Sequence, residues 1–180
     1  SLPMQSTALV LAHWVCAESA QAMRQSEQVQ HHLDAALAVT AKGSGVVAQE
    51  GVRLRSIRWA LDNRDTPVAR TRLVALPKAV SRRVQVWRSR LDLALLDDQP
   101  QQALEAVRTL NKHGVFAGDT SVSLQRSLAA QMLSTATDLG SLNATWKNLP
   151  ETERAGYEVV LAWVGQRLAL GDLPQAAEAQ

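Results

Sequence analysis

Residues 57–76 read IRWALDNRDTPVARTRLVAL, and residues 91–110 read LDLALLDDQPQQALEAVRTL. Apolar residues recur between the two stretches at a spacing of 34 positions, so that Ile57 corresponds to Leu91. Each stretch is interrupted by a polar break that contains a proline, which is typical of two helices joined by a tight turn. The sequence therefore predicts an all-α fold in which helix pairs are repeated.

The period of 34 residues is that of a tetratricopeptide array, in which helix pairs stack because each pair has two apolar sides. We predict a right-handed superhelical array of about five antiparallel helix pairs, a degenerate tetratricopeptide-repeat solenoid. It forms a single domain over residues 1–180, with its best periodicity over residues 50–112. The expected pairs are 4–23 with 27–41, 46–63 with 66–76, 81–97 with 99–112, 119–137 with 141–148, and 150–170 with a truncated last helix.

Four residues mark the structural repeat positions of this array. Ala69, Ala103 and Ala176 are small, so that the second helix of a pair can approach the first closely. Trp87 lies 16 positions before Ala103, at the large-aromatic position of the repeat, and we interpret it as a packing residue. In addition, the predicted N-caps of two helices are Thr66 and Ser81.

Composition limits the class of protein. Of the 180 residues 46% are hydrophobic and 20% are charged, which indicates a globular chain. The single cysteine excludes an internal disulfide, and no apolar run reaches the roughly 20 residues that span a bilayer. Because the chain starts at Ser1 without a signal peptide and stops inside a helical pattern, we expect a soluble domain excised from a larger membrane-anchored protein.

The strongest functional signal is a basic segment over residues 53–90. It holds 11 of the 19 lysines and arginines of the chain and only 2 of its 17 acidic residues. One interpretation is a solvated helix surface, and the other is a patch that binds an acidic peptide, haem propionates or anionic lipid. Arginine suits bidentate contacts with carboxylates, and exposed aromatic residues for nucleic-acid stacking are lacking. The predicted partner- or anion-binding residues are Arg53, Arg55, Arg58, Arg82, Arg83 and Arg88.

Six side chains are candidate ligands of haem or of a metal ion, namely His13, Cys16, Met23, His31, His32 and His113. His13 and Cys16 share a helix face, whereas His31 and His32 point to different sides. The sequence has no Cys-x-x-Cys and no Cys-x-x-Cys-His motif, so we predict no metal site and no bound cofactor. His13 and Cys16 are interpreted as packing or groove-lining residues.

Catalytic motifs are absent from the sequence. There is no Gly-x-Ser-x-Gly nucleophile elbow and no Gly-x-Gly-x-x-Gly motif after a strand for a flavin. Glu151 and Glu153 fall in the first turn of a predicted helix, where the helix dipole favours acids, so they are not interpreted as an acid–base pair. We predict that the protein is not an enzyme.

A further group of motifs lies mainly in the C-terminal half. These are Leu104–Ala106, Leu110–Lys112, Ala144–Pro150 (ATWKNLP), Arg154, the apolar stripe of residues 159–169, Gly171-Asp172 and Ala176-Ala177. They resemble bacterial HemY proteins, best over residues 50–180. The resemblance implies a tetratricopeptide domain attached to the inner membrane by a pair of N-terminal transmembrane helices, in a family associated with late haem biosynthesis in proteobacteria.

HemY proteins of this type lack a recognised catalytic site and are regarded as scaffolds. We therefore predict a non-enzymatic protein–protein interaction scaffold, with haem-pathway or membrane proteins as candidate partners and no nucleic acid. The full-length protein is expected at a bacterial inner membrane, through segments absent from this chain. The alternative is a carrier or sensor that binds haem, another tetrapyrrole or an anionic ligand through an arginine-rich groove.

Overall fold

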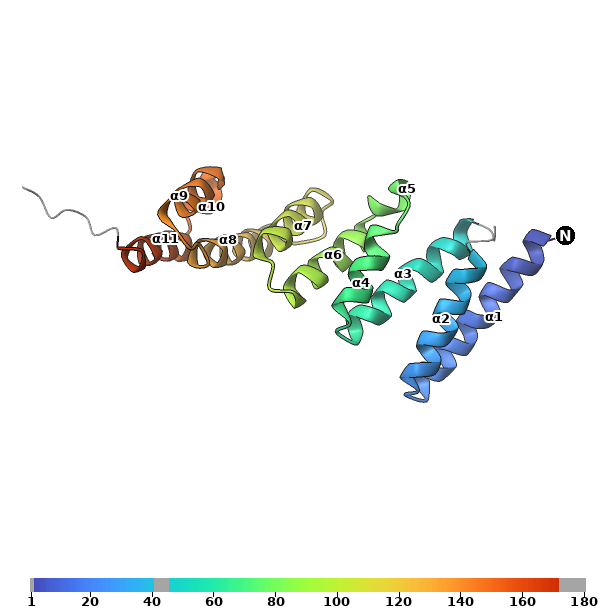
Figure 1. Ribbon diagram of the computed structural model, residues 1–180. Coiled ribbons are helices and arrows are strands. Elements are labelled where there is room, and N and C mark those ends of the chain that lie inside the picture. The colour runs from blue at the N-terminus through green and yellow to red at the C-terminus, as the bar shows by residue number, and fades with distance from the viewer. Residues whose placement is uncertain (1, 41–45, 172–180) are drawn as a thin grey trace, which may run out of the picture. The chain divides into compact units, whose positions relative to one another are not determined.

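The computed structural model describes residues 2–40 and 46–171, and the regular structure of these residues is α-helical throughout (Figure 1). The prediction of an all-α chain is confirmed for this part of the sequence. The helices are α1 (Leu2–Ala22), α2 (Ser26–Thr40), α3 (Val46–Asp62), α4 (Thr66–Val74), α5 (Lys78–Ser81), α6 (Val84–Leu96), α7 (Pro100–Lys112), α8 (Gly118–Ser134), α9 (Leu139–Asn148), α10 (Glu151–Arg154) and α11 (Tyr157–Ala169).

The helices form two compact units, residues 1–89 and residues 90–180, whose boundary falls within α6. In the first unit α1 and α2 form an antiparallel hairpin, α3 contacts both of them, and α4 packs against α3 (Figure 1). In the second unit α8 contacts α7, α9, α10 and α11. Each unit therefore has its own set of packed helices.

The core of the first unit joins three helices. Val10, Ala36 and Val52, from α1, α2 and α3, are fully buried against one another, and Trp14 packs beside them. The Trp14 ring lies directly over Gly51, where an added Cβ would be 2.8 Å from a ring carbon. Since even a methyl group would collide with the indole, glycine is what lets α3 approach α1 this closely.

Three connections between helices share one backbone geometry. Arg24, Arg64 and Asp98, which follow α1, α3 and α6, have left-handed φ angles of 58°, 56° and 51°. The N–H of the next residue donates to the carbonyl five positions back, at 2.9, 2.8 and 2.8 Å respectively. This Schellman motif ends one helix and reverses the chain within three residues. Arg64 and Asp98 are 34 positions apart, so the period of the sequence recurs in these turns.

The left-handed φ at Arg64 predicts a stabilising substitution. Arg64→Gly removes the steric cost of a Cβ in this region and should raise the free energy of unfolding by about 0.5–1 kcal/mol, measured by urea denaturation followed by circular dichroism. The matched control is Arg70→Gly, in the interior of α4, which should lower it by about 1 kcal/mol. Equal destabilisation by both changes would contradict this account of the turn.

A longer repeat relates α3–α6 to α8–α11. The bounds of α5 and α10 are offset by 73 positions at both ends, and so are those of α6 and α11. Asp65 and Asp138, also 73 positions apart, cap α4 and α9 by accepting the backbone N–H of Val68 and Ser141. The same capping interaction and the same short helix therefore recur in both halves of the chain.

Two predicted N-caps are wrong. Asp65, and not Thr66, is the N-cap of α4. Its carboxylate accepts the backbone N–H of Val68 at 3.3 Å, which satisfies a donor that the first turn of the helix leaves free. Ser81 ends α5 and donates its hydroxyl to the carbonyl of Lys78 at 3.0 Å, so the predicted helix 81–97 begins at Val84. The predicted last helix, with Ala176, lies outside the described residues. Of the other repeat positions, Ala69 and Ala103 are fully buried and Trp87 is half-buried.

The predicted continuous helix over residues 150–170 is broken at Gly156, between α10 and α11. Arg126 of α8 donates to the carbonyl of Thr152 from Nε and Nη2, at 3.3 and 3.1 Å. In a continuous helix that carbonyl would accept the N–H of Gly156, which instead bonds to Glu153 at 3.0 Å. A Cβ on Gly156 would lie 2.7 Å from Arg126 Cδ, so the absence of a side chain at the break leaves room for the arginine.

Glu153 holds α10 against α7. It lies in the first turn of α10, as predicted, but its side chain is only 5% exposed. Arg108 donates Nε to Oε1 at 2.9 Å and Nη2 to Oε2 at 2.6 Å, a bidentate pair that satisfies both carboxylate oxygens. The corresponding residue 73 positions earlier is the buried Val80, so the second unit has an ion pair where the first has an apolar side chain.

Glu153→Gln should lower the free energy of unfolding by about 2 kcal/mol, because the buried site loses a charge-assisted pair. Arg108 is half-exposed and regains hydration when the pair is broken, so the effect should lie below the range for fully buried pairs. Urea denaturation measures the change. The control Glu151→Gln, at the exposed start of the same helix, should change stability by less than about 0.5 kcal/mol. A loss no larger than that of the control would contradict the role of Glu153.

Aromatic stacking joins α9 to α11. The rings of Trp146 and Trp163 are stacked, with centroids 4.7 Å apart and planes inclined by 23°. The guanidinium carbon of Arg154 is 5.9 Å from the Trp146 centroid, and that of Arg167 is 4.7 Å from the Trp163 centroid. Stacking and cation–π attraction therefore stabilise the contact between α9 and α11.

Candidate binding site

The first unit contains a pocket of about 410 Å³ that we call the arginine pocket. A volume of this size is in the range of sites for small ligands or for one or two side chains of a peptide. Its walls come from α1, α3 and α6, and its lining residues are Trp14, Gly51, Leu54, Arg55, Arg58, Gln85, Arg88 and Ser89.

Helical spacing places these residues in the pocket. Gly51, Leu54, Arg55 and Arg58 are separated by three or four positions, so they share one face of α3. The three residues from α6 follow the same spacing. Trp14 of α1 supplies an apolar wall over Gly51. The pocket thus combines apolar surface with three cationic side chains on two neighbouring faces.

The three arginines of the pocket differ in their partners. Arg55 donates Nε to Glu18 at 2.6 Å and also bonds to Gln21, which ties α3 to α1. Arg58 pairs with Asp62 one turn later at 2.9 Å, an exposed contact of small energy. Arg88 is exposed and has no ion pair within the described part of the chain. Arg88 is therefore the cation most available to an incoming anion.

The other three predicted site residues lie elsewhere. Arg53 lines a separate pocket of about 210 Å³, together with Arg72 and residues of α2 and α4. Arg82 is the exposed C-cap of α5, and Arg83 pairs with Glu50 at 2.6 Å. The structure thus brings Arg55, Arg58 and Arg88 together and leaves the remaining three in other surroundings.

Acidic residues outside the basic segment form ion pairs with some of its arginines. Glu18 is 37 positions from Arg55, and Asp34 is 38 positions from Arg72, which it contacts at 2.7 Å while that arginine also donates to the Ser56 carbonyl. Sequence reasoning missed these partners because it counted acids only within residues 53–90. Their pairing depends on which helices meet, and no local pattern reports this.

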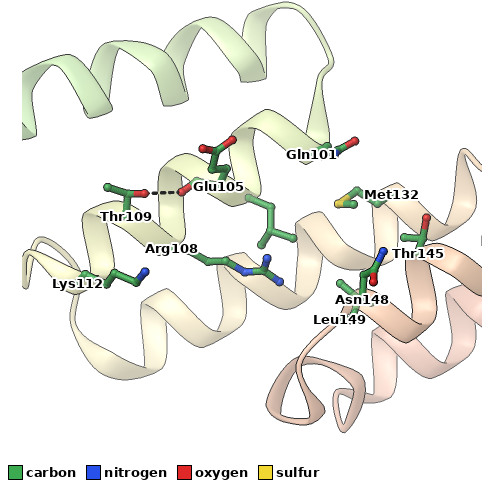
Figure 2. A pocket seen from close by; sticks show the side chains of 10 residues that line it. Gln101, Glu105, Arg108, Thr109, Lys112, Met132, Thr145, Asn148 and Leu149 are labelled. Carbon is green, nitrogen blue, oxygen red and sulfur yellow. Dashed lines mark hydrogen bonds between the residues drawn. The ribbon is translucent and has the colours of Figure 1, made fainter. Parts of the chain in front are cut away.

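The second unit contains a pocket of about 490 Å³, which sequence reasoning did not identify (Figure 2). Six of its lining residues follow one face of α7, and α8 and the α9 end supply the rest. Figure 2 shows Arg108 reaching across from α7 toward Asn148 and Leu149. The guanidinium is held in this direction by Glu153, and the lining is mixed in polarity. The sequence motifs of this region gave no indication of a pocket, because it forms only where α7, α8 and α9 meet.

The candidate haem or metal ligands fall in several places. Cys16, Met23 and His113 are exposed, and none of the six candidates lines the arginine pocket. His13 of α1 and His32 of α2 are half-buried and face each other. Burial, then the neighbouring His32 and His31, lower the pKa of His13 below its ordinary value of 6.5.

This lowered pKa predicts a loss of stability in acid. The unfolded chain binds a proton at His13 near pH 6.5, whereas the folded chain resists it, so the contribution is fully present above that pH and is lost as the pH falls below it. The melting temperature, followed by circular dichroism, should fall between pH 7.5 and 5.5 by more in the wild type than in His13→Gln. The exposed control His113→Gln should keep the wild-type dependence. An unchanged slope in His13→Gln would show that His13 does not contribute.

In the described helices no segment is long and apolar enough to cross a membrane. A scan against models of known protein families and searches of curated proteins and of solved structures found no match.

Proposed function

We propose that the protein is a non-enzymatic scaffold that binds an acidic, partly apolar segment of a partner protein in the arginine pocket. The observation that carries this proposal is the convergence of Arg55, Arg58 and Arg88 on a cavity walled by Trp14 and Leu54. Arginine side chains suit carboxylates, and the apolar wall suits an aliphatic or aromatic side chain of the same segment. Binding energy would come from the apolar contact, and the arginines would select for charge.

The carrier alternative has less support. Axial ligation of a tetrapyrrole needs a histidine, cysteine, methionine or tyrosine at the pocket, and the residues that line the arginine pocket include none of these. A peptide needs no such ligand. The scaffold proposal therefore accounts for the pocket with the side chains that are present.

The proposal extends to the architecture and the family. We infer that the helix pairs stack as a tetratricopeptide array of the HemY type, with the full-length protein at a bacterial inner membrane. Two observations support the array: the left-handed turns 34 positions apart, and the contact of α3 with both helices of the preceding pair. The family and the haem-pathway partners rest on the resemblance of the sequence.

A peptide array tests the scaffold proposal. Twelve-residue peptides that combine Asp or Glu with Leu, Phe or Trp are compared with amide versions in which Asn and Gln replace the acids. Acidic peptides should bind the wild-type protein, and the double variant Arg58→Glu/Arg88→Glu should bind them at least about ten-fold more weakly, because like charges then face each other. Fluorescence anisotropy measures each affinity.

The matched control is Arg82→Glu, which makes the same charge change at an exposed arginine outside the pocket. It should leave the affinity within about two-fold of the wild type, since an exposed charge outside the pocket is screened by salt. Equal weakening by the control would indicate general attraction to a basic surface. Binding that is unaffected in the double variant would reject the arginine pocket as the site.

A further inference from the structure

His13 and His32 form a pair of facing imidazoles between α1 and α2. Their Nδ1 atoms are 3.2 Å apart, and the ring centroids are 5.5 Å apart. The residues are 19 positions apart in sequence and meet because the turn at Arg24 reverses the chain. Both rings are half-buried, and His31 packs edge-on against His32 with centroids 5.4 Å apart.

The distance between the two nitrogens matches a tetrahedral zinc ion. Zn–N bonds of about 2.0–2.1 Å at a tetrahedral angle place two nitrogens about 3.3–3.4 Å apart. Two ligands at right angles, as in the square-planar sites that Cu²⁺ and Ni²⁺ favour, would be only about 2.9 Å apart. The observed separation of 3.2 Å is closer to the zinc geometry, and both rings would turn so that each Nδ1 lone pair points at an ion that lies off the line between the two nitrogens.

We propose that His13 and His32 form a Zn²⁺-binding site that bridges α1 and α2 through their Nδ1 atoms. Within residues 2–40 and 46–171 no group of three or more His, Cys, Asp or Glu side chains is placed to hold a metal. The ion would therefore have two protein ligands and two open positions for water. This site is separate from the arginine pocket and does not depend on the proposed function.

The chemistry of the pair suits a neutral ligand set. Zinc binds the neutral imidazole, and burial, then the neighbouring His32 and His31, lower the pKa of His13, which favours the neutral ring. In the metal-free pair one Nδ1–H donates to the other Nδ1, so both rings cannot carry the same tautomer. Coordination moves the proton of the donor ring to its Nε2, and two neutral rings release no proton.

Isothermal titration of the tag-free protein with ZnCl₂ at pH 7.5 tests the site. We expect saturable binding of one ion per chain, weakened at least about ten-fold by His13→Gln and by His32→Gln, since each removes one of two ligands. The control His113→Gln removes an exposed histidine of the second unit and should leave the affinity unchanged. One-to-one binding that is unchanged in both variants, or no saturable binding at all, would overturn the proposal.

A second measurement needs no substitution, so it also tests the site if the histidine variants fail to fold. Imidazole ¹⁵N spectra of the wild-type protein identify which ring nitrogens the ion contacts. Zinc should shift the Nδ1 signals of His13 and His32 and leave those of His113 in place. Shifts confined to Nε2 or to other histidines would overturn the bridging site.

Discussion

The pairing of helices depends on the three-residue turn with one residue in the left-handed region. Arg24, Arg64 and Asp98 adopt this conformation although none is a glycine, at a cost of about 1–2 kcal/mol each. The hydrogen bond that closes each turn determines where the next helix starts, and therefore which of its faces meets the helix before it. The contact of His13 with His32 and the shared core of α1, α2 and α3 both follow from this constraint.

The repetition at 73 positions is closer in the connections between helices than in the side chains that the helices bury. Aspartate caps α4 and α9, and a proline precedes each of the four-residue helices α5 and α10. The interiors differ, because Val80 corresponds to the paired Glu153, and the buried Leu73 corresponds to Trp146 of the aromatic stack. Caps and prolines act through the local backbone, whereas interior side chains adapt to the particular helices around them. At these two positions the second unit therefore has an ion pair and an aromatic stack, where the first has buried apolar side chains.

In the folded chain, some arginines of the basic segment are engaged in contacts between helices and are not available to a ligand. Several of its arginines fasten helices together, as Arg55 does between α3 and α1 and Arg72 between α4 and α2. Half-exposed pairs of this kind contribute little free energy, but they orient the side chains. What is left for binding is a smaller set of cations beside apolar surface at the arginine pocket, where selectivity for an acidic partner can arise.

Much of the local structure could be predicted from the sequence, since apolar periodicity and turn residues act over a few positions. The helices of the first two pairs and α7 lie within about two residues of their expected bounds, and Glu153 was placed correctly in a first turn. The break at Gly156 was not predictable, because it depends on Arg126 of another helix. Tertiary structure alone brought together Arg55 with Glu18, Arg108 with Glu153, and the three arginines of the pocket. The reason is physical: a hydrophobic period reports which face of a helix is buried, but it carries no information about which helix covers that face.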